Sequence, residues 1–497
     1  MRKVTRRAAA VGCGIVIAAA AATAAGGTDV KVDVKPLHEG RINPMLFGSF
    51  VELLDDLVPG MWAEMLNDRG FDGVIPQAKW CYYDGRPNFC DREWEKDASW
   101  TYDTDKPFNG ERSAKLTCGA AGRAMLAQGG TAVVKGATYV FSGHFRGDNP
   151  GLKARVALRA LLPDGAWMEL ASAELAAFSS EWKKYTATLT SSGTTDRAVF
   201  ALEALGGGSL WADRLSLMPA DNRKGWRDDV VQAITEMRPG VVRWGGSTCD
   251  PGAYRWKEAI GERDRRRPFP NRVWGRIDSN DVGVDEFCQF CEMVKAQPLF
   301  CISFSDGPQS AADLIEYCNG PAGTEWGAKR VANGRPEPYG VKYWQVGNEL
   351  GNEIYVKGCP AFCEAMKRAD PKAALLASFP SQALLEKCGK DFAYIGPHHY
   401  TPDLAECESD FVKLTQMVKT IPGCAHIRIS VTEWNITAGW WGIMRGKMLT
   451  LESALQNARY LNPVSYTHLR AHETPEHLVC RLLLEKKKHN KINCLVR

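Results

Sequence analysis

Two glutamates, Glu349 and Glu433, each follow a run of residues that reads as a β-strand: Glu349 ends WQVGNE, and Glu433 lies in ISVTEWN. A pair of carboxyl groups can cleave a glycosidic bond when their roles differ. One group stays protonated and gives its proton to the leaving oxygen, while the other stays ionised and attacks the anomeric carbon. Spacing alone is a weak signal, because a chain of 497 residues holds many glutamate pairs. A surface or ion-paired glutamate is the alternative for each.

Other polar residues also follow short apolar runs, among them Arg243 after GVV, Asn348 before Glu349, and the triplet His398–Tyr400. From about residue 220 to 462, such runs alternate with helical patterns, which indicates a parallel sheet. Only a (β/α)8 barrel gathers the ends of many strands around one site. We therefore expect an α/β fold, a (β/α)8 TIM barrel, whose first strand lies in NPMLFGSFVELLDD and ends at Glu52.

Residues 81–219 have a different sequence pattern: short runs of alternating apolar and polar residues are separated by Gly, Asp, Ser and Pro. This pattern is typical of a β-sandwich. The segments NGERSAKLT and GSLWADRLSLMP resemble the carbohydrate-binding jelly-roll modules found beside glycosidases. We predict an all-β jelly-roll sandwich inserted after the first barrel strand. Its tryptophans either stack on sugar rings or form the core.

Several motifs occur in an order that points to one family: FGSFVELLDD, RWGG, YWQVGNE, HHY and SVTEWN. Together they resemble the α-L-arabinofuranosidases of glycoside hydrolase family 51, over residues 27–80 and 221–462. The resemblance implies a retaining glycosidase with its acid/base on barrel strand four and its nucleophile on strand seven. It implies no cofactor and no metal ion.

Matching motif positions assigns the site residues that the resemblance implies. Glu349 falls on the acid/base and Glu433 on the nucleophile. The remaining assignments are Asn348 to the sugar 2-hydroxyl, Tyr400 to a hydrogen bond with the nucleophile, Glu52 to a sugar hydroxyl and Trp274 to an aromatic wall. Packing is the alternative for these four. The sequence departs from the family at Arg243–Ser247, where RWGGS replaces R-[YFW]-P-G-G-N, so the subsite that binds the terminal sugar is expected to differ.

Both ends of the chain read differently from the middle. Residues 1–26 combine a basic start with an Ala-rich apolar stretch, which is typical of a signal peptide and predicts a secreted or periplasmic protein. Residues 463–497 form a basic tail that resembles read-through of foreign sequence. We expect this tail to supply no barrel strand. The natural chain would then continue differently after about Asn462, leaving the barrel incomplete at its C-terminus.

The net charge is +4, and the excess lies at the two ends, so a nucleic-acid partner has no electrostatic support. After the N-terminus no apolar run is long enough to span a membrane. The expected partner is an arabinose-containing polysaccharide or oligosaccharide, and the sequence leaves the oligomeric state open. Two alternatives to an arabinofuranosidase remain. One is an endo-β-glucanase or another retaining barrel glycosidase, and the other is a carbohydrate-binding protein without turnover.

Overall fold

In the computed structural model, the structure describes residues 43–53, 57–72, 99–120, 122–252, 254–271, 273–274, 276–435 and 450–469. The predicted signal peptide, an expected strand at 29–34 and most of the basic tail lie outside these residues. Among the described residues, no helix has both the length and the apolar character that a membrane span requires.

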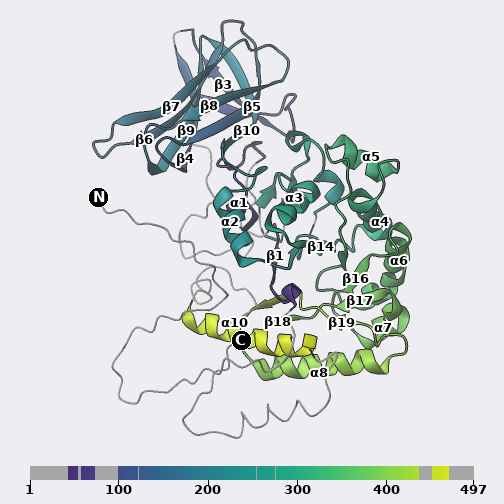
Figure 1. Ribbon diagram of the computed structural model, residues 1–497. Coiled ribbons are helices and arrows are strands. Elements are labelled where there is room, and N and C mark those ends of the chain that lie inside the picture. Colours follow the sequence, from purple (N-terminus) through teal and green to yellow (C-terminus); the bar gives the residue numbers. More distant parts are fainter. Residues whose placement is uncertain are drawn as a thin grey trace, which may run out of the picture. The chain divides into compact units, whose positions relative to one another are not determined.

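A parallel sheet forms the larger region, as the alternation of strands and helices predicts (Figure 1). Seven strands follow one another in the order of the chain: β1 (Gly48–Val51), β11 (Val241–Trp244), β14 (Gln297–Ile302), β15 (Tyr343–Val346), β16 (Ala374–Ala377), β17 (Phe392–Ile395) and β19 (Arg428–Ile429). A second parallel pair, β18 (His398–Tyr400) and β20 (Glu433–Asn435), follows the last two strands. The predicted barrel class is confirmed, and the described residues supply seven strands of its parallel sheet.

Helices follow the strands and pack apolar faces against them, so the barrel core lies between the two layers. The helices are α1 (Leu57–Met61), α2 (Asp228–Met237), α3 (Val284–Val294), α4 (Gly307–Asn319), α5 (Glu325–Ala332), α6 (Glu353–Ala369), α7 (Gln382–Cys388), α8 (Leu404–Thr420) and α10 (Leu451–Leu469). Short 3-10 turns occupy Pro44–Leu46, Trp256–Glu258, Arg263–Arg265 and Gly389–Asp391. Side-chain caps fix several starts; Asp403, for example, accepts from the amides of Ala405 and Glu406 before α8.

The inserted region is a sandwich of two antiparallel sheets with a core of its own, as predicted. One sheet runs in the order β2 (Trp100–Asp103), β3 (Ser113–Cys118), β10 (Gly208–Pro219), β5 (Thr138–Gly147) and β8 (Lys183–Thr190). The other runs in the order β4 (Arg123–Val133), β9 (Thr195–Leu205), β6 (Lys153–Leu161) and β7 (Trp167–Leu175). Phe141 and Phe200 stack across the two sheets at 5.4 Å, whereas the guanidinium of Arg146 lies over Trp211.

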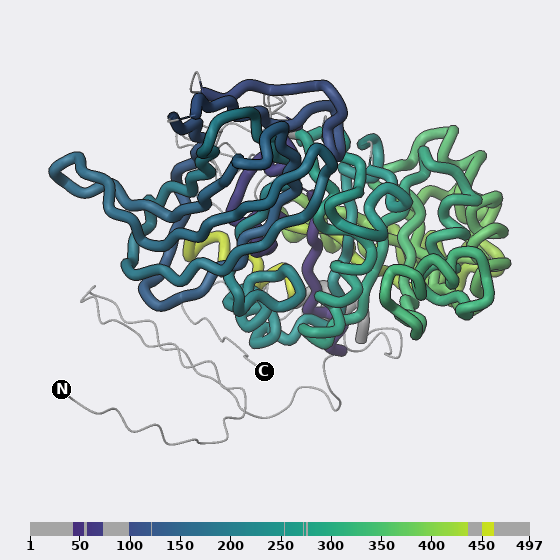
Figure 2. Tube along the Cα trace, turned by 90° about the horizontal axis from the view of Figure 1, so that it is seen from above, coloured from purple at the N-terminus to yellow at the C-terminus, as the bar shows by residue number. Residues whose placement is uncertain are grey.

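The chain leaves the barrel after β1 and returns before β11, and the two connecting segments lie side by side. The amide of Ala63 donates to the carbonyl of Gly225 at 2.7 Å, and the amide of Met65 donates to that of Leu217 at 2.9 Å. Figure 2 follows this path from the purple β1 through the blue sandwich to the teal barrel strands. The insertion therefore begins and ends at neighbouring points.

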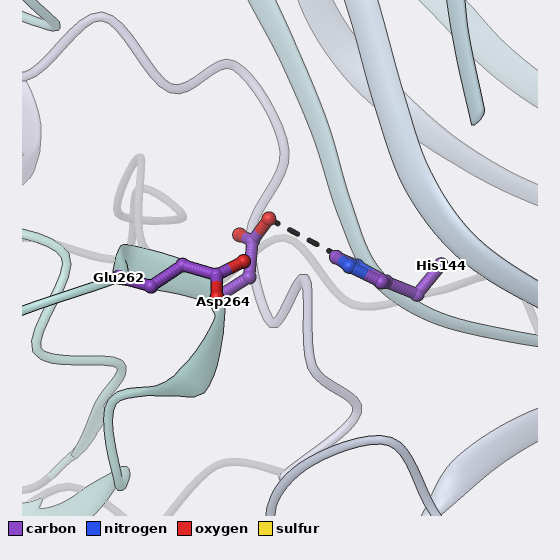
Figure 3. Close-up of side chains that lie close together, drawn as sticks. All are labelled: His144, Glu262 and Asp264. Atoms are coloured by element: carbon purple, nitrogen blue, oxygen red, sulfur yellow. Dashed lines mark ion pairs between the residues drawn. The ribbon is translucent and has the colours of Figure 1, made fainter. Parts of the chain in front are cut away.

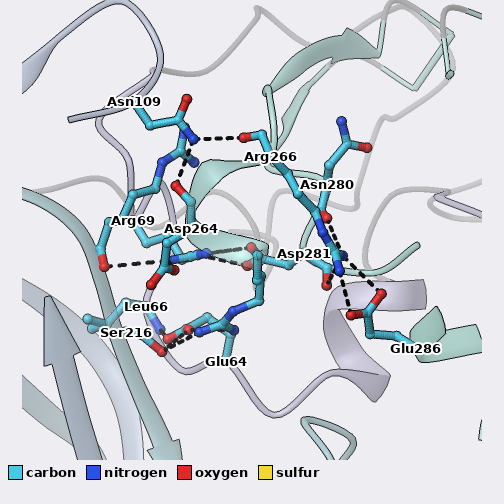
Figure 4. Close-up of polar contacts among 12 residues, drawn as sticks. Glu64, Leu66, Arg69, Asn109, Ser216, Asp264, Arg266, Asn280, Asp281 and Glu286 are labelled. Carbon is cyan, nitrogen blue, oxygen red and sulfur yellow. Dashed lines mark hydrogen bonds and ion pairs between the residues drawn. The ribbon is translucent and has the colours of Figure 1, made fainter. Parts of the chain in front are cut away.

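A buried network of charges joins the segment that leaves the barrel, and the sandwich itself, to loops of the barrel, and we call it the joint (Figure 4). Arg69 donates to Asp281 from Nε at 2.8 Å and from Nη2 at 2.7 Å, and to Asp264 from Nη1 at 2.9 Å. Lys184 of the sandwich reaches the second oxygen of Asp264 at 2.6 Å. Asn109 donates to the backbone carbonyls of Asp264 and Arg266. Charged groups, and not only apolar packing, thus hold the two regions together.

Helix α10 extends to Leu469 and so crosses the boundary that the sequence suggested at residue 462. It lies beside α8 (Figure 1). Cys288 and Cys291 have the C-x-x-C spacing of some metal and redox sites, but both are buried in the helix α3.

Candidate active site

Glu433 begins β20 and is buried at the C-terminal ends of the barrel strands. Its Oε1 accepts a hydrogen bond from Nη1 of Arg243 at 2.7 Å, and its Oε2 accepts one from the hydroxyl of Tyr400 at 2.5 Å. Burial by itself would raise the pKa of Glu433, but Arg243, His398 and Tyr400 outweigh it and hold that pKa below its usual value. Glu433 is therefore ionised at neutral pH, the state that a nucleophilic carboxylate needs.

Arg243, at the end of β11, holds three side chains of the site with its planar guanidinium. Besides Glu433, it donates from Nε to Gln345 at 2.8 Å and from Nη2 to the Oδ1 of Asn348 at 2.7 Å. Both Gln345 and Asn348 are buried and belong to β15 and the turn after it. A fork of fixed geometry orients three partners at once, which a lysine cannot do.

Glu349 follows Asn348 and has a left-handed backbone conformation, with φ at 51°. This conformation is uncommon for a residue with a side chain. The Oε1 of Glu349 lies 3.0 Å from Nδ1 of His398, and the side chain is 41% exposed. Glu433, by contrast, has a side chain only 9% exposed. One glutamate is thus open to solvent and the other is enclosed.

His398 connects the two glutamates. Its Nδ1 is 3.0 Å from Glu349 and 3.6 Å from Oε2 of Glu433, and its Nε2 is 2.9 Å from the hydroxyl of Thr432. Two carboxylates facing Nδ1 favour a proton on that nitrogen, leaving Nε2 to accept from Thr432. One oxygen of Glu349 and one of Glu433 lie within 4.8 Å of each other.

Glu52, directly after β1, lies buried beside this group. Its Oε1 accepts from the amide of Thr248 at 2.8 Å and from the indole N–H of Trp274 at 2.9 Å. Burial raises the pKa of Glu52 to about 7, against these hydrogen bonds, and the charge of Glu433 adds to the increase. Gly246 makes the arrangement possible, because a Cβ there would lie 2.4 Å from the Oε2 of Glu52 and φ is +119°.

The structure brings together all six residues that the sequence suggested. His398 contacts both Glu349 and Glu433, and Tyr400 donates to Glu433 directly. Arg243 links Asn348 to Glu433, and Trp274 donates to Glu52. The sequence placed Arg243 and His398 at strand ends but gave them no role in the site, and it gave no indication of Gln345 or Thr248. Arg243 and His398 stand at strand ends, and that position was the available signal. Gln345 and Thr248 carry no local signal.

Among the residues that the structure describes, two clusters offer ligand-type atoms to a metal ion. In the first, Glu349, His398 and Glu433, the guanidinium of Arg243 already supplies positive charge to Glu433. The second, His144, Glu262 and Asp264, lies in the joint (Figure 3). There Arg69 and Lys184 already occupy both oxygens of Asp264. Neighbouring cations disfavour a divalent ion in both clusters.

Comparisons with known proteins identify both regions. Residues 233–417 match the family model for an alpha-L-arabinofuranosidase 1 domain, and residues 88–207 match a carbohydrate binding domain. The second match falls on the inserted sandwich.

Named relatives and a solved structure agree with these matches. Probable alpha-L-arabinofuranosidase C of Aspergillus terreus is 34% identical over 168 residues, which are 32% of this chain and 33% of the relative. Alpha-L-arabinofuranosidase 2 of Arabidopsis thaliana is 27% identical over 398 residues, covering 71% of this chain and 56% of the relative. An arabinose-bound GH51 α-L-arabinofuranosidase superposes with a TM-score of 0.67 at 19% identity, covering 88% of this chain and 74% of that one.

The chain spans about a third of the length of the Aspergillus relatives it matches, and the solved structure supports the barrel fold. The resemblance found in the sequence is confirmed: the barrel region matches an alpha-L-arabinofuranosidase domain, and the region inserted after its first strand matches a carbohydrate binding domain.

Proposed function

We propose that this protein removes terminal α-L-arabinofuranosyl residues from arabinose-containing plant polysaccharides with retention of anomeric configuration. The separation of the two carboxylates carries the proposal. One oxygen of Glu349 and one of Glu433 lie within 4.8 Å. Retaining glycosidases hold their carboxyl groups about 5–5.5 Å apart, whereas inverting ones need about 6.5–9.5 Å to admit a water.

In the first step, Glu433 attacks the anomeric carbon and the bond from that carbon to the leaving oxygen breaks. Glu349, in its protonated form, gives its proton to the leaving oxygen. In the second step, Glu349 takes a proton from water, the water oxygen bonds to the anomeric carbon, and Glu433 leaves as a carboxylate. The exposure of Glu349 suits a group that must meet both leaving group and water, and the enclosure of Glu433 suits a nucleophile.

The neighbours of the pair support this division of roles. Arg243 and Tyr400 stabilise the carboxylate form of Glu433. His398 contacts both glutamates and can stabilise whichever one bears the charge at each step. Glu52, Asn348 and Trp274 would hold hydroxyl groups and one face of the terminal sugar.

Turnover of p-nitrophenyl α-L-arabinofuranoside, with the first-formed sugar anomer followed by NMR, tests the proposal. We expect the α-anomer to form first. The β-anomer would indicate inversion and contradict the role of Glu433. Turnover of β-glucan chains without turnover of the arabinofuranoside would favour an endo-glucanase, and binding without any turnover would favour a non-catalytic protein.

The role of Glu349 has a separate test. Glu349→Ala should slow cleavage of substrates with poor leaving groups by roughly 10²–10⁴-fold, because these need a proton. With a dinitrophenyl leaving group, the glycosylation step should be nearly unaffected. Equal losses on both substrates would remove Glu349 from the acid role.

We also propose that the protein is secreted or periplasmic. The support is the basic and then Ala-rich sequence of residues 1–26. Mass spectrometry of the exported protein should find a new N-terminus near residue 27, and an intact Met1 on the mature protein would contradict export by this route.

A further inference from the structure

Tyr460 of α10 lies against the back of the two strands that carry the site. Its side chain is buried, with the residue 4% exposed. Its hydroxyl is 2.6 Å from Nδ1 of His399, and its ring stacks on Trp434 with centroids 4.6 Å apart and planes 19° apart. One side chain from a third element therefore touches both β18 and β20.

The register of these strands shows why those two contacts matter. His398 pairs with Glu433, His399 with Trp434, and Tyr400 with Asn435. Because side chains alternate along a strand, His399 and Trp434 face away from the site while their neighbours face into it. The contacts agree, since His398 and Tyr400 both approach Glu433, whereas His399 and Trp434 both contact Tyr460.

His399 is also fixed from its other side. Its Nε2 lies 2.8 Å from Oδ2 of Asp410 on α8. The carboxylate of Asp410 favours a proton on Nε2, so Nδ1 is left to accept a hydrogen bond from the hydroxyl of Tyr460. Phe411 packs against the ring of His399 with centroids 4.9 Å apart. The imidazole is thus held between two helices, and it holds the backbone of β18 in turn.

We infer that Tyr460 is a positioning residue for the proposed reaction: by holding His399 and Trp434 it keeps β18 and β20 in register and so sets Glu433 against Tyr400 and His398. This inference rests on the proposed function, because the reaction supplies one of its two tests. Hydrogen bonds of 2.5 Å to Tyr400 and 2.7 Å to Arg243 leave Glu433 little tolerance for displacement. A misplacement of about 1 Å can cost roughly 10² in rate.

Two variants separate the two contacts. Tyr460→Phe keeps the ring on Trp434 and removes only the hydroxyl, whereas Tyr460→Leu removes both. Tyr317→Phe is the matched control, because Tyr317 is a buried tyrosine whose hydroxyl donates to Asp285 at 2.7 Å, outside the site. Circular dichroism and urea unfolding fix a temperature at which each variant is fully folded.

Two measurements are made on the full chain. The first is kcat and KM on p-nitrophenyl α-L-arabinofuranoside. Tyr460→Phe should lower kcat about tenfold and Tyr460→Leu roughly 10²-fold, with KM nearly unchanged, because the reacting carboxylate moves while sugar contacts remain. Tyr317→Phe should leave both constants at wild-type values. A folded Tyr460→Leu variant with wild-type kcat would overturn the inference.

The second measurement is hydrogen exchange of backbone amides by mass spectrometry, which needs no turnover. Tyr460→Leu should speed exchange at 398–400 and 433–435 and leave β14–β16 unchanged. Local faster exchange in a chain whose wild type shows no glycosidase activity would keep the positioning role and reject the proposed function. Uniformly faster exchange across the barrel, or none, would mean that Tyr460 only adds general stability, and would overturn the inference. If Tyr460→Leu does not fold, Tyr460→Phe gives the same readouts at smaller amplitude.

Discussion

Arg243 in the site and Arg69 in the joint are both buried arginines, but they differ in how many carboxylates each one compensates. Arg69 reaches both Asp264 and Asp281, and Lys184 adds a second cation to Asp264. Burial would raise the pKa of Asp264, but these cations outweigh it and lower the value to about 2. Among the described acidic residues of the site, Arg243 donates a hydrogen bond only to Glu433. Its other two hydrogen bonds go to the side-chain amide oxygens of Gln345 and Asn348.

The consequence is visible at Glu52. It lies beside Glu433, no cation among the described residues bonds to it, and burial raises its pKa to about 7. Cations therefore compensate Asp264 and Asp281 in the joint, which serves stability, whereas the site places the ionised Glu433 beside Glu52, whose pKa is raised.

The largest effect should come from removing the carboxylate of Glu433. Glu433→Ala should lower kcat by roughly 10⁴-fold or more, because the glycosylation step loses its nucleophile. Azide should restore turnover of an activated substrate and give the β-configured azide as product. The control is Glu353→Ala, a highly exposed glutamate of α6 that pairs with Lys357. Wild-type kcat in Glu433→Ala would place the nucleophile elsewhere.

Breaking the joint should affect folding more than chemistry. Arg69→Met leaves Asp264 and Asp281 buried with less compensation, and it should lower the free energy of unfolding by about 3–5 kcal/mol. Urea unfolding measures the loss, and kcat of the remaining folded protein should stay near that of the wild type. A large drop in kcat at full folding would show that the joint also shapes the site.

The pKa of Glu52 gives the stability a pH dependence with a definite sign. Its pKa rises from 4.5 to about 7 on folding, so the protonated form is favoured in the folded state. Stability from this group is complete below about pH 4.5 and falls as the pH rises toward 7.

Urea unfolding at pH 5 and pH 8 tests this. From pH 5 to pH 8, the free energy of unfolding of the wild type should fall by about 2–3 kcal/mol more than that of Glu52→Gln, because the glutamine cannot ionise. Glu353→Gln is the control and should follow the wild type at both pH values. Parallel curves for the wild type and Glu52→Gln would mean that Glu52 ionises normally.

The smallest effect sharpens the contrast within the joint. Lys184 also contacts Asp264, but its side chain is 45% exposed. Lys184→Met should lower the free energy of unfolding by less than about 1 kcal/mol, because solvent screens an exposed cation and Arg69 still compensates the carboxylate of Asp264. A loss as large as that of Arg69→Met would show that the two cations act as one unit.

The sequence predicts the strands, their parallel order and the carboxylates at their ends, because each of these follows from a local run such as WQVGNE or ISVTEWN. Contacts between distant segments have no local trace. Arg69 is separated from Asp264 and Asp281 by about 200 residues, and nothing near Arg69 marks it as buried. Trp274 was expected only as an aromatic wall, yet its indole N–H also donates to Glu52. Its ring is visible in the sequence, but the partner of its N–H is not.

The position of the insertion has a consequence for how the chain folds. Gly48 of β1 pairs with Val241 of β11, which lies 193 positions further along the chain. The ribosome must therefore release the whole sandwich before the first two barrel strands can meet, and closing so long a flexible loop costs entropy and time. A sandwich that folds first removes most of that cost, because its ends already meet at Ala63 and Gly225. Damage to the sandwich core would then delay barrel assembly during synthesis, even with every barrel residue intact.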